Sequence, residues 1–266
     1  KANTTASYNT GIGTSALGAT TTGASNTALG ASALVANTTG TKNVAIGHDA
    51  LTTITTGSYN VAVGTEALKV NTANGNTAVG QDTLKASTTG AGNTAVGQNA
   101  LTSNTTGTYN TALGYGALDA HTVANDCVAV GRDALGANTT ASSNVAVGAY
   151  AMLVNTTGTE NTAVGFRALD ANVDTANNTA IGNAALGANI ASDNTAVGAS
   201  ALTANTTGAN NVAVGATALD ANTTGEQNVA VGDSALDANT TGDKNTAIGR
   251  YAMLNNTTAS FNVAIG

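Results

Sequence analysis

The chain has 266 residues, a formal net charge of −7, 32 Gly, no Pro and a single Cys, and only 9% of its residues are charged. Globular domains usually carry about 25% charged residues, so this composition disfavours a single thick core. The negative charge argues against a nucleic-acid partner, because phosphate binding needs clustered Lys and Arg. No apolar run reaches the length that crosses a membrane.

One short string, N-[TV]-A-[VIL]-G, recurs sixteen times along the chain, with single substitutions at Gly11 and Cys127. Its final Gly returns every 17 residues, except for two steps of 16, from Gly64 to Gly80 and from Gly182 to Gly198. A fixed period of this kind is the signature of stacked repeats. Numbered one to seventeen from the Asn, the full unit reads N-[TV]-A-[VIL]-G-x-x-A-L-x-A-N-T-T-G-x-x.

The first element expected in every unit is a strand over positions two to four, from 10–12 in the first unit to 263–265 in the last. Thr, Val and Ile suit the extended pleat, and the Gly at position five can end the strand with a positive φ. Alternation puts positions two and four on one face and position three on the other. Because position four is always a branched aliphatic residue, the sequence predicts that positions two and four face the core.

The second element expected is a short strand, A-L-x-A, over positions eight to eleven, with the Leu or Met of position nine also facing inward. The N-T-T-G string that follows has the turn chemistry of a corner. Both shortened units lose their residue here, at Asn71–Gly75 and Asn189–Asp193. Since deletions are tolerated in turns, this stretch is predicted to be a turn.

These elements predict an all-β fold: a parallel β-solenoid of sixteen coils of 16–17 residues. We expect one repetitive domain over residues 1–266, a fragment of a longer fibre. Successive coils would lie about 4.8 Å apart, and the Asn side chains of position one would bond along the stack. The predicted core ladder combines positions four and nine and is represented by Val63, Leu68, Val96, Leu101, Leu113 and Leu118.

The Ala columns of positions three and eight are predicted to point away from that core. An apolar strip of methyl groups along the whole stack would not stay wet, and small residues allow close approach of a neighbour. We therefore expect these columns to pack against other copies of the chain. The representative interchain residues are Ala95, Ala100, Ala112, Ala117, Ala163 and Ala168.

Strings such as N-V-A-I-G-H-D-A-L at Asn43–Leu51 resemble the head repeats of trimeric autotransporter adhesins of the YadA type. The A-N-T-T-G string at Ala204–Gly208 is similar to the repeats of tail-fibre-like proteins. The resemblance covers the whole chain. It implies a left-handed β-roll, a side-by-side homotrimer and an extracellular location, on a cell surface or in a virion fibre.

No residue set indicates catalysis, a cofactor or a metal. His48 and His121 occupy different positions of the unit, six and twelve, and Cys127 stands in the Asn column. Asp220 and Asp237 are equivalent residues of adjacent coils, and we interpret them as solvated like charges rather than as a cation site. The chain is therefore not expected to be an enzyme.

The predicted function is that of a structural or adhesive fibre segment, the head or shaft of a trimeric surface adhesin or tail fibre. Its expected partners are copies of itself and, at a receptor-binding surface, a host-surface glycan or protein. Neither nucleic acid nor membrane insertion is expected. An ice-binding solenoid is the first alternative, disfavoured because the Thr residues at positions thirteen and fourteen would point opposite ways. A polysaccharide-acting β-helix is the second, but no coil departs far enough from the repeat.

Overall fold

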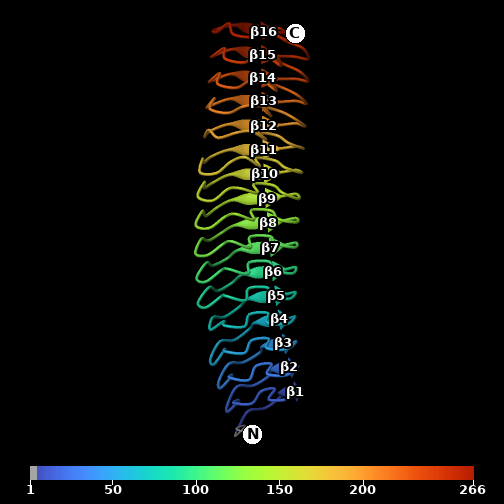
Figure 1. Ribbon diagram of the computed structural model, residues 1–266, viewed down its shortest axis with the longest axis vertical. Helices are drawn as coiled ribbons and strands as arrows, with labels where there is room; N and C mark the ends of the chain where they lie inside the picture. The colour runs from blue at the N-terminus through green and yellow to red at the C-terminus, as the bar shows by residue number, and fades with distance from the viewer. Residues whose placement is uncertain (1–4) are drawn as a thin grey trace. The chain divides into compact units, whose positions relative to one another are not determined.

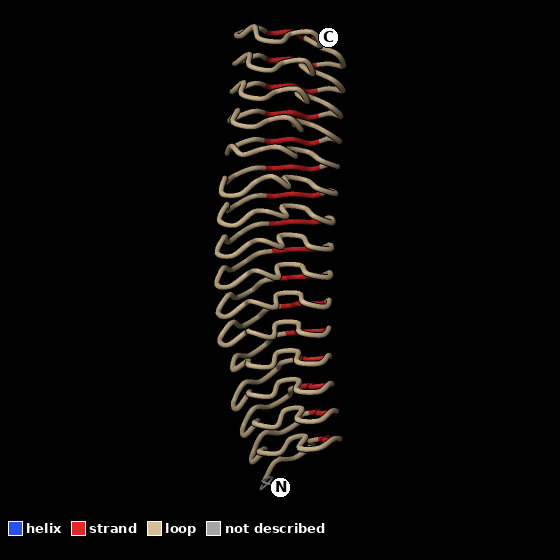
Figure 2. The backbone as a smooth tube through the Cα atoms, in the orientation of Figure 1, coloured by secondary structure: helices blue, strands red, loops and turns tan. Residues whose placement is uncertain are grey.

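A computed structural model describes residues 5–266, which form an all-β, parallel β-solenoid of about 15 turns with no helix in that range. The described residues form two compact units, residues 5–132 and 133–266. Every strand has three residues and covers positions two to four of its unit, as predicted. The strand occupies the same place in each turn, and loops and turns make up the remainder (Figure 2).

The strands of each unit follow one another in sequence order (Figure 1). Residues 5–132 contain β1 (Thr10–Ile12), β2 (Thr27–Leu29), β3 (Val44–Ile46), β4 (Val61–Val63), β5 (Thr77–Val79), β6 (Thr94–Val96), β7 (Thr111–Leu113) and β8 (Val128–Val130). Residues 133–266 contain β9 (Val145–Val147), β10 (Thr162–Val164), β11 (Thr179–Ile181), β12 (Thr195–Val197), β13 (Val212–Val214), β14 (Val229–Val231), β15 (Thr246–Ile248) and β16 (Val263–Ile265). Within each unit neighbouring strands pair in parallel and in register, so that Ala62 lies beside Ala78 and Ala196 beside Ala213.

The faces of these strands are the reverse of the prediction. Ala95 and Ala112, at position three, are fully buried, whereas Leu113, at position four, is 47% exposed. A Cβ built on Gly11, the position-three residue of the first coil, would lie 3.2 Å from Leu17 Cδ1. Position three therefore faces the Leu of position nine inside the same coil. Opposite the large side chain of position nine, the interior has room for only a methyl group at position three.

The predicted core ladder is thus half correct. Its position-nine members, Leu68, Leu101 and Leu118, are completely buried, as expected. Its position-four members point outward: Val63 and Val96 are half-buried and Leu113 is exposed. The prediction was wrong there because it equated a large apolar side chain with an inward one.

The predicted interchain residues are likewise placed inside a single chain. All six have no exposed surface, so none of them is available to a neighbouring copy: Ala95, Ala100, Ala112, Ala117, Ala163 and Ala168. The Ala columns are small because the coil is thin at that point. Any contact between copies must use another surface.

The predicted second strand is also wrong, because positions six to eleven form turns. Leu101 and its equivalents adopt positive φ values, 51° in Leu101 itself. A strand would send consecutive residues to opposite faces. The left-handed conformation at position nine instead allows Ala100 and Leu101 to be buried together.

The corner after each strand depends on Gly at position five. Gly47 has φ +134°, and a Cβ built there would lie 2.5 Å from the carbonyl oxygen of Gly64 in the next coil. Both the conformation and the close approach of the two backbones exclude a side chain. This explains why position five is Gly in all sixteen repeats.

The Asn column of position one links the coils, as the sequence predicted. The backbone N–H of Asn43 donates to Asn26 Oδ1 at 2.9 Å, and Asn43 Nδ2 donates to the Gly57 carbonyl at 2.8 Å. Each Asn side chain therefore bonds both to the backbone just before the strand of the next coil and to the corner of its own coil. Cys127 keeps one of these bonds, because its backbone N–H donates to Asn110 Oδ1 at 3.0 Å.

The reversed faces can be tested by placing a Leu side chain at each of two neighbouring residues. Ala112→Leu is expected to destabilise the fold by about 1–3 kcal/mol or more, because position three has no free space. Thr111→Leu places the same side chain on the opposite face of the strand, which is exposed within the chain, and is expected to cost far less stability. Thermal melting followed by circular dichroism measures both. An equal loss in the two variants would contradict the assignment of the faces.

Candidate interaction surface

The side chains of positions two and four form a continuous surface on each unit, which we call the outer sheet face. Position two is Thr or Val in every strand and position four is Val, Ile or Leu, so no charged side chain interrupts the face. Away from the ends of the stack, Leu113 is 47% exposed and Ile181 and Ile248 are 40% exposed. An uncharged face of this kind is unusual on a surface that stays in water.

The size of the outer sheet face follows from strand geometry. The strands of one unit, about 4.8 Å apart and about 10 Å wide, cover on the order of 400 Å². The largest apolar patch on a typical soluble monomer is about 300–600 Å² and is often functional. Each unit therefore presents one patch of that size on its outer sheet face.

Two rows of residues border the outer sheet face. The leading edge is the residue two before each strand, at position seventeen, and the trailing edge is the residue two after it, at position six. Most exposed aromatic residues lie on these edges, for example Tyr59 and Tyr109 on the leading edge, at 60% and 68% exposure, and Tyr115 and Phe166 on the trailing edge, at 53% and 47%. These residues lie far apart in the sequence, and only the fold shows that they flank one face.

Cations accompany several of these rings. Lys42 Nζ lies 4.9 Å from the centre of the Tyr59 ring, and Lys244 Nζ lies 5.2 Å from that of Phe261. On the trailing side, the Arg167 guanidinium lies 5.5 Å from the centre of the Phe166 ring. Exposed aromatic and Arg side chains are enriched where proteins bind partners, so the edges have the composition of an interface rim.

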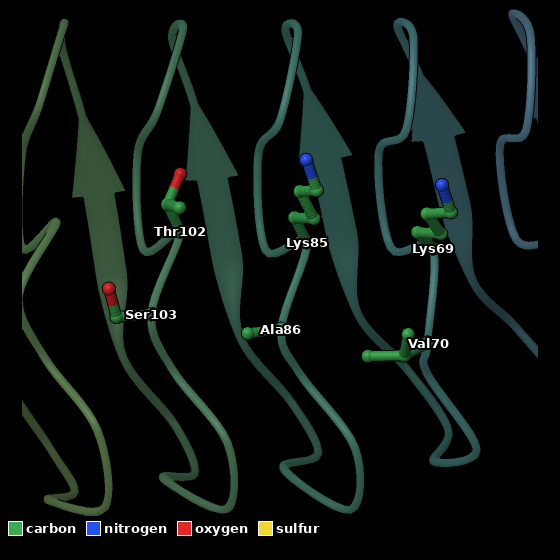
Figure 3. Close-up of a pocket in the computed structure, with 6 residues that line it drawn as sticks. All are labelled: Lys69, Val70, Lys85, Ala86, Thr102 and Ser103. Atoms are coloured by element: carbon green, nitrogen blue, oxygen red, sulfur yellow. The ribbon is translucent and has the colours of Figure 1, made fainter.

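A shallow trough of about 690 Å³ lies on the opposite side of the coils, away from the strands (Figure 3). Two ammonium groups stand beside an apolar floor and two hydroxyl groups, and the lining residues are Lys69, Val70, Lys85, Ala86, Thr102 and Ser103.

The ammonium groups of the trough are engaged with carboxylates. Lys69 Nζ lies 2.6 Å from Glu66 Oε1 and 3.4 Å from Asp49, and Lys85 Nζ lies 2.5 Å from Glu66 Oε2 and 3.1 Å from Asp82. Hydrogen bonds from Lys69 and Lys85 lower the pKa of Glu66 to about 2. Three carboxylates against two ammonium groups leave the cluster without positive charge, which does not favour an anionic ligand.

The two histidines have unrelated surroundings. His48 is exposed, with Nδ1 3.6 Å from an Asp49 oxygen, whereas His121 is fully buried, with Nε2 2.9 Å from the Ala124 carbonyl. Burial lowers the pKa of His121 below its usual value of 6.5. Within residues 5–266, no three His, Cys, Asp or Glu side chains gather as ligands for a metal ion.

His121 interrupts a second buried Asn column, at position twelve, which the sequence did not reveal as a column of bonds. In an intact stretch, Asn222 Nδ2 donates to Asn205 Oδ1 at 2.8 Å and to the Gly225 carbonyl at 3.0 Å. His121 keeps the contact with its own corner, where Nε2 lies 2.9 Å from the Ala124 carbonyl. Asn104 Oδ1, in the preceding coil, consequently has no hydrogen-bond partner. Asn37 Oδ1 is unpartnered in the same way, because the next residue of its column is Ile54.

The stacked carboxylates of Asp220 and Asp237 are energetically unfavourable. Burial, and then the neighbouring Asp237 charge, raises the pKa of Asp220. Burial, and then the charge of Asp233, raises the pKa of Asp237. Their surroundings therefore make the charged carboxylates less favourable than in an exposed Asp.

No model of a known protein family matches the chain, and no curated protein matches it. The resemblance to adhesin heads and tail-fibre repeats therefore remains a prediction. Within residues 5–266 no helix has the length and apolar character needed to span a membrane.

His121→Asn is expected to stabilise the chain, because the new amide can donate to the buried Asn104 Oδ1. Satisfying a buried polar atom is worth about 1 kcal/mol. Since the pKa of His121 is lowered on folding, the parent should lose stability as the pH falls through about 6.5, and the variant should lose less. Urea unfolding at pH 7.5 and pH 5 measures both effects. The matched control is His48→Asn, at the exposed histidine; if it removes the acid sensitivity and His121→Asn does not, the assignment is wrong.

Asp220→Asn is expected to raise stability at pH 7. The folded-state pKa of Asp220 is raised, so the energetic penalty is absent at low pH and appears as the pH rises above about 3.8, the usual Asp value. The gain over the parent should therefore be larger at pH 7 than at pH 3. Asp174→Asn, at an exposed corner, is the control. A gain that does not depend on pH would contradict this account.

Proposed function

We propose that this chain is a segment of a structural or adhesive fibre whose copies associate side by side through the outer sheet face. The observation that carries the proposal is the uninterrupted apolar and hydroxyl composition of that face in every strand. Position four points outward and is nevertheless always aliphatic. A residue facing water in every copy would be free to vary, as the exposed position six does.

The extent of the face supports this reading. The outer sheet faces of the two units contribute together on the order of 800 Å² per chain, and a standard stable interface covers about 800 Å² on each partner. Burying apolar surface stabilises by about 25 cal/mol per Å², which favours covering the face. The aromatic and charged edges then correspond to the polar rim that surrounds an interface core.

The finer parts of the proposal rest on the resemblance of N-V-A-I-G and A-N-T-T-G strings to adhesin heads and tail fibres. They are a left-handed coil, a homotrimer, and an extracellular location on a cell surface or virion. In that setting the segment would space or present a surface that binds a host glycan or protein. The corrected faces change which residues join the copies, since the outer sheet face replaces the Ala columns.

One observation favours ice binding as a second candidate. The outer sheet face carries two regular columns of mostly β-branched residues, about 4.8 Å apart along the stack and roughly 6.6 Å apart across it. Such a flat array could order water if it stayed exposed. Self-association requires the outer sheet face to be covered by another copy, whereas ice binding requires it to be exposed to water. An experiment that shows whether the face is covered therefore distinguishes the two candidate functions.

Light scattering on the folded chain tests the proposal, with a trimeric mass as the expected result. The double variant Val212→Lys, Val214→Lys places two charges on the outer sheet face of β13 and should yield monomers with unchanged circular dichroism. Thr207→Lys with Thr224→Lys adds the same charge at exposed corners and should keep the parent mass. A monomeric parent would refute the self-association, and thermal hysteresis in that monomer would support ice binding instead.

A further inference from the structure

We infer that the corner at Asn74–Gly75 is a site of spontaneous covalent modification, at which the Asn side chain closes onto the backbone, loses ammonia and is hydrolysed to aspartate and isoaspartate. The co-reactant is water. Asn74 is the one Asn in the sequence that is followed by Gly. The inference concerns a corner of a single coil and goes beyond the proposed self-association.

The reaction begins with attack of the Gly75 backbone nitrogen on Cγ of Asn74. The new N–Cγ bond forms as this nitrogen gives its proton to water, and the side-chain amide nitrogen takes up a proton and leaves as ammonia. Water then adds to one of the two carbonyl carbons of the cyclic imide. Opening at Cγ gives aspartate. Opening at the main-chain carbonyl gives isoaspartate, in which the chain runs through the former side chain.

Both reacting groups are turned toward Ser58 in the preceding coil. The backbone N–H of Ser58 donates to Asn74 Oδ1 at 2.7 Å, and the Gly75 N–H donates to the Ser58 carbonyl at 3.1 Å. The carbonyl of the Asn74 side chain and the nitrogen that attacks it therefore lie on the same side of the corner. The bond from Ser58 also stabilises the negative charge that develops on Oδ1 during the attack. The Gly75 N–H must first leave Ser58, and exposed loop bonds open locally without unfolding of the remainder.

The corner is open to water, and its Gly is not required by the fold. Asn74 and Gly75 are exposed, and a Cβ built on Gly75 would have no atom within 4 Å. Gly75 has φ +70°, but the equivalent residues Ser25 and Ser143 adopt φ values of 60° and 61° with a side chain. A side chain at residue 75 should therefore hinder the attacking nitrogen and leave the coil intact.

Two neighbouring Asn residues lack this combination. Asn71 and Asn76 are fully buried, and each precedes a Thr. Asn71 Nδ2 donates to the Ala73 carbonyl at 3.1 Å. Asn76 Nδ2 donates to the Gly90 carbonyl at 2.8 Å. Because their amides are buried and bonded and a β-branched residue follows each, both should remain unmodified and serve as internal controls.

The two products should affect the stack differently. Aspartate keeps an acceptor for the Ser58 N–H, and Asp243 does the same in another coil, where its Oδ1 accepts from the Glu226 N–H at 2.8 Å. Isoaspartate instead adds one methylene group to the main chain. The addition lies two residues before Asn76, whose N–H donates to Asn60 Oδ1 at 3.0 Å. We therefore expect isoaspartate, and not aspartate, to weaken the junction between β4 and β5.

Peptide mapping of the intact folded chain tests the inference. After incubation at pH 9, the tryptic peptide 70–85 should contain aspartate and isoaspartate at residue 74, with Asn71 and Asn76 unchanged, in comparison with a sample that was not incubated. Labelling by an isoaspartyl methyltransferase identifies the isoaspartate. Gly75→Ser is expected to abolish both products and to keep the circular dichroism of the parent. If the folded chain stays unmodified under conditions that modify the urea-unfolded chain, the coil protects the corner and the inference is wrong.

Thermal melting measures the consequence of the modification. The incubated parent should melt at a lower temperature in proportion to its isoaspartate content, whereas incubated Gly75→Ser and fresh Asn74→Asp should melt as the fresh parent does. An equal loss in fresh Asn74→Asp would assign the effect to the new charge and would contradict the role of the added methylene group. None of these measurements depends on the oligomeric state, so a monomeric parent would refute the proposed self-association and leave this inference standing.

Discussion

The close approach of successive coils is the constraint on which the rest of this structure depends. Gly47 and its equivalents bring one backbone against the next with no space for a side chain. The Asn residues of position one then join each coil to its neighbour through buried hydrogen bonds. Because these contacts recur at every turn, stability accumulates by neighbouring pairs. A thin core of one Leu or Met, small residues and hydrogen-bonded Asn side chains in most coils is then sufficient.

The repeat itself, the three-residue strand and its parallel stacking were predictable from the sequence, because periodicity and Gly placement determine them. The direction in which the strand faces was not. Position four is as apolar as position nine, and residue type alone cannot separate an inward Leu101 from an outward Leu113. The deciding fact is the conformation of position nine, whose positive φ lets Ala100 and Leu101 enter the same interior. Composition gives little sign of this conformation, because Leu rarely adopts it.

The same reversal explains why the candidate surface was placed on the wrong residues. Two columns made almost entirely of Ala suggested contact between chains, whereas they mark the thinnest part of a single coil. The outer sheet face and its edges emerge only when positions two, four, six and seventeen are located on one side of the coil. Residues that look dispersed in the sequence, such as Tyr109 and Tyr115, then border the same strand. The trough around Lys69 and Lys85 is the more visible hollow, but its charges are already paired.

The coil-by-coil bonding has a consequence for how such a gene can change. A coil contacts only the coils before and after it, and the joining atoms belong to residues shared by nearly every repeat. Unequal recombination between repeats can therefore add or remove one whole unit and leave every remaining junction chemically equivalent. The length of the protein is in this sense an adjustable quantity, and a change in length requires no new fold.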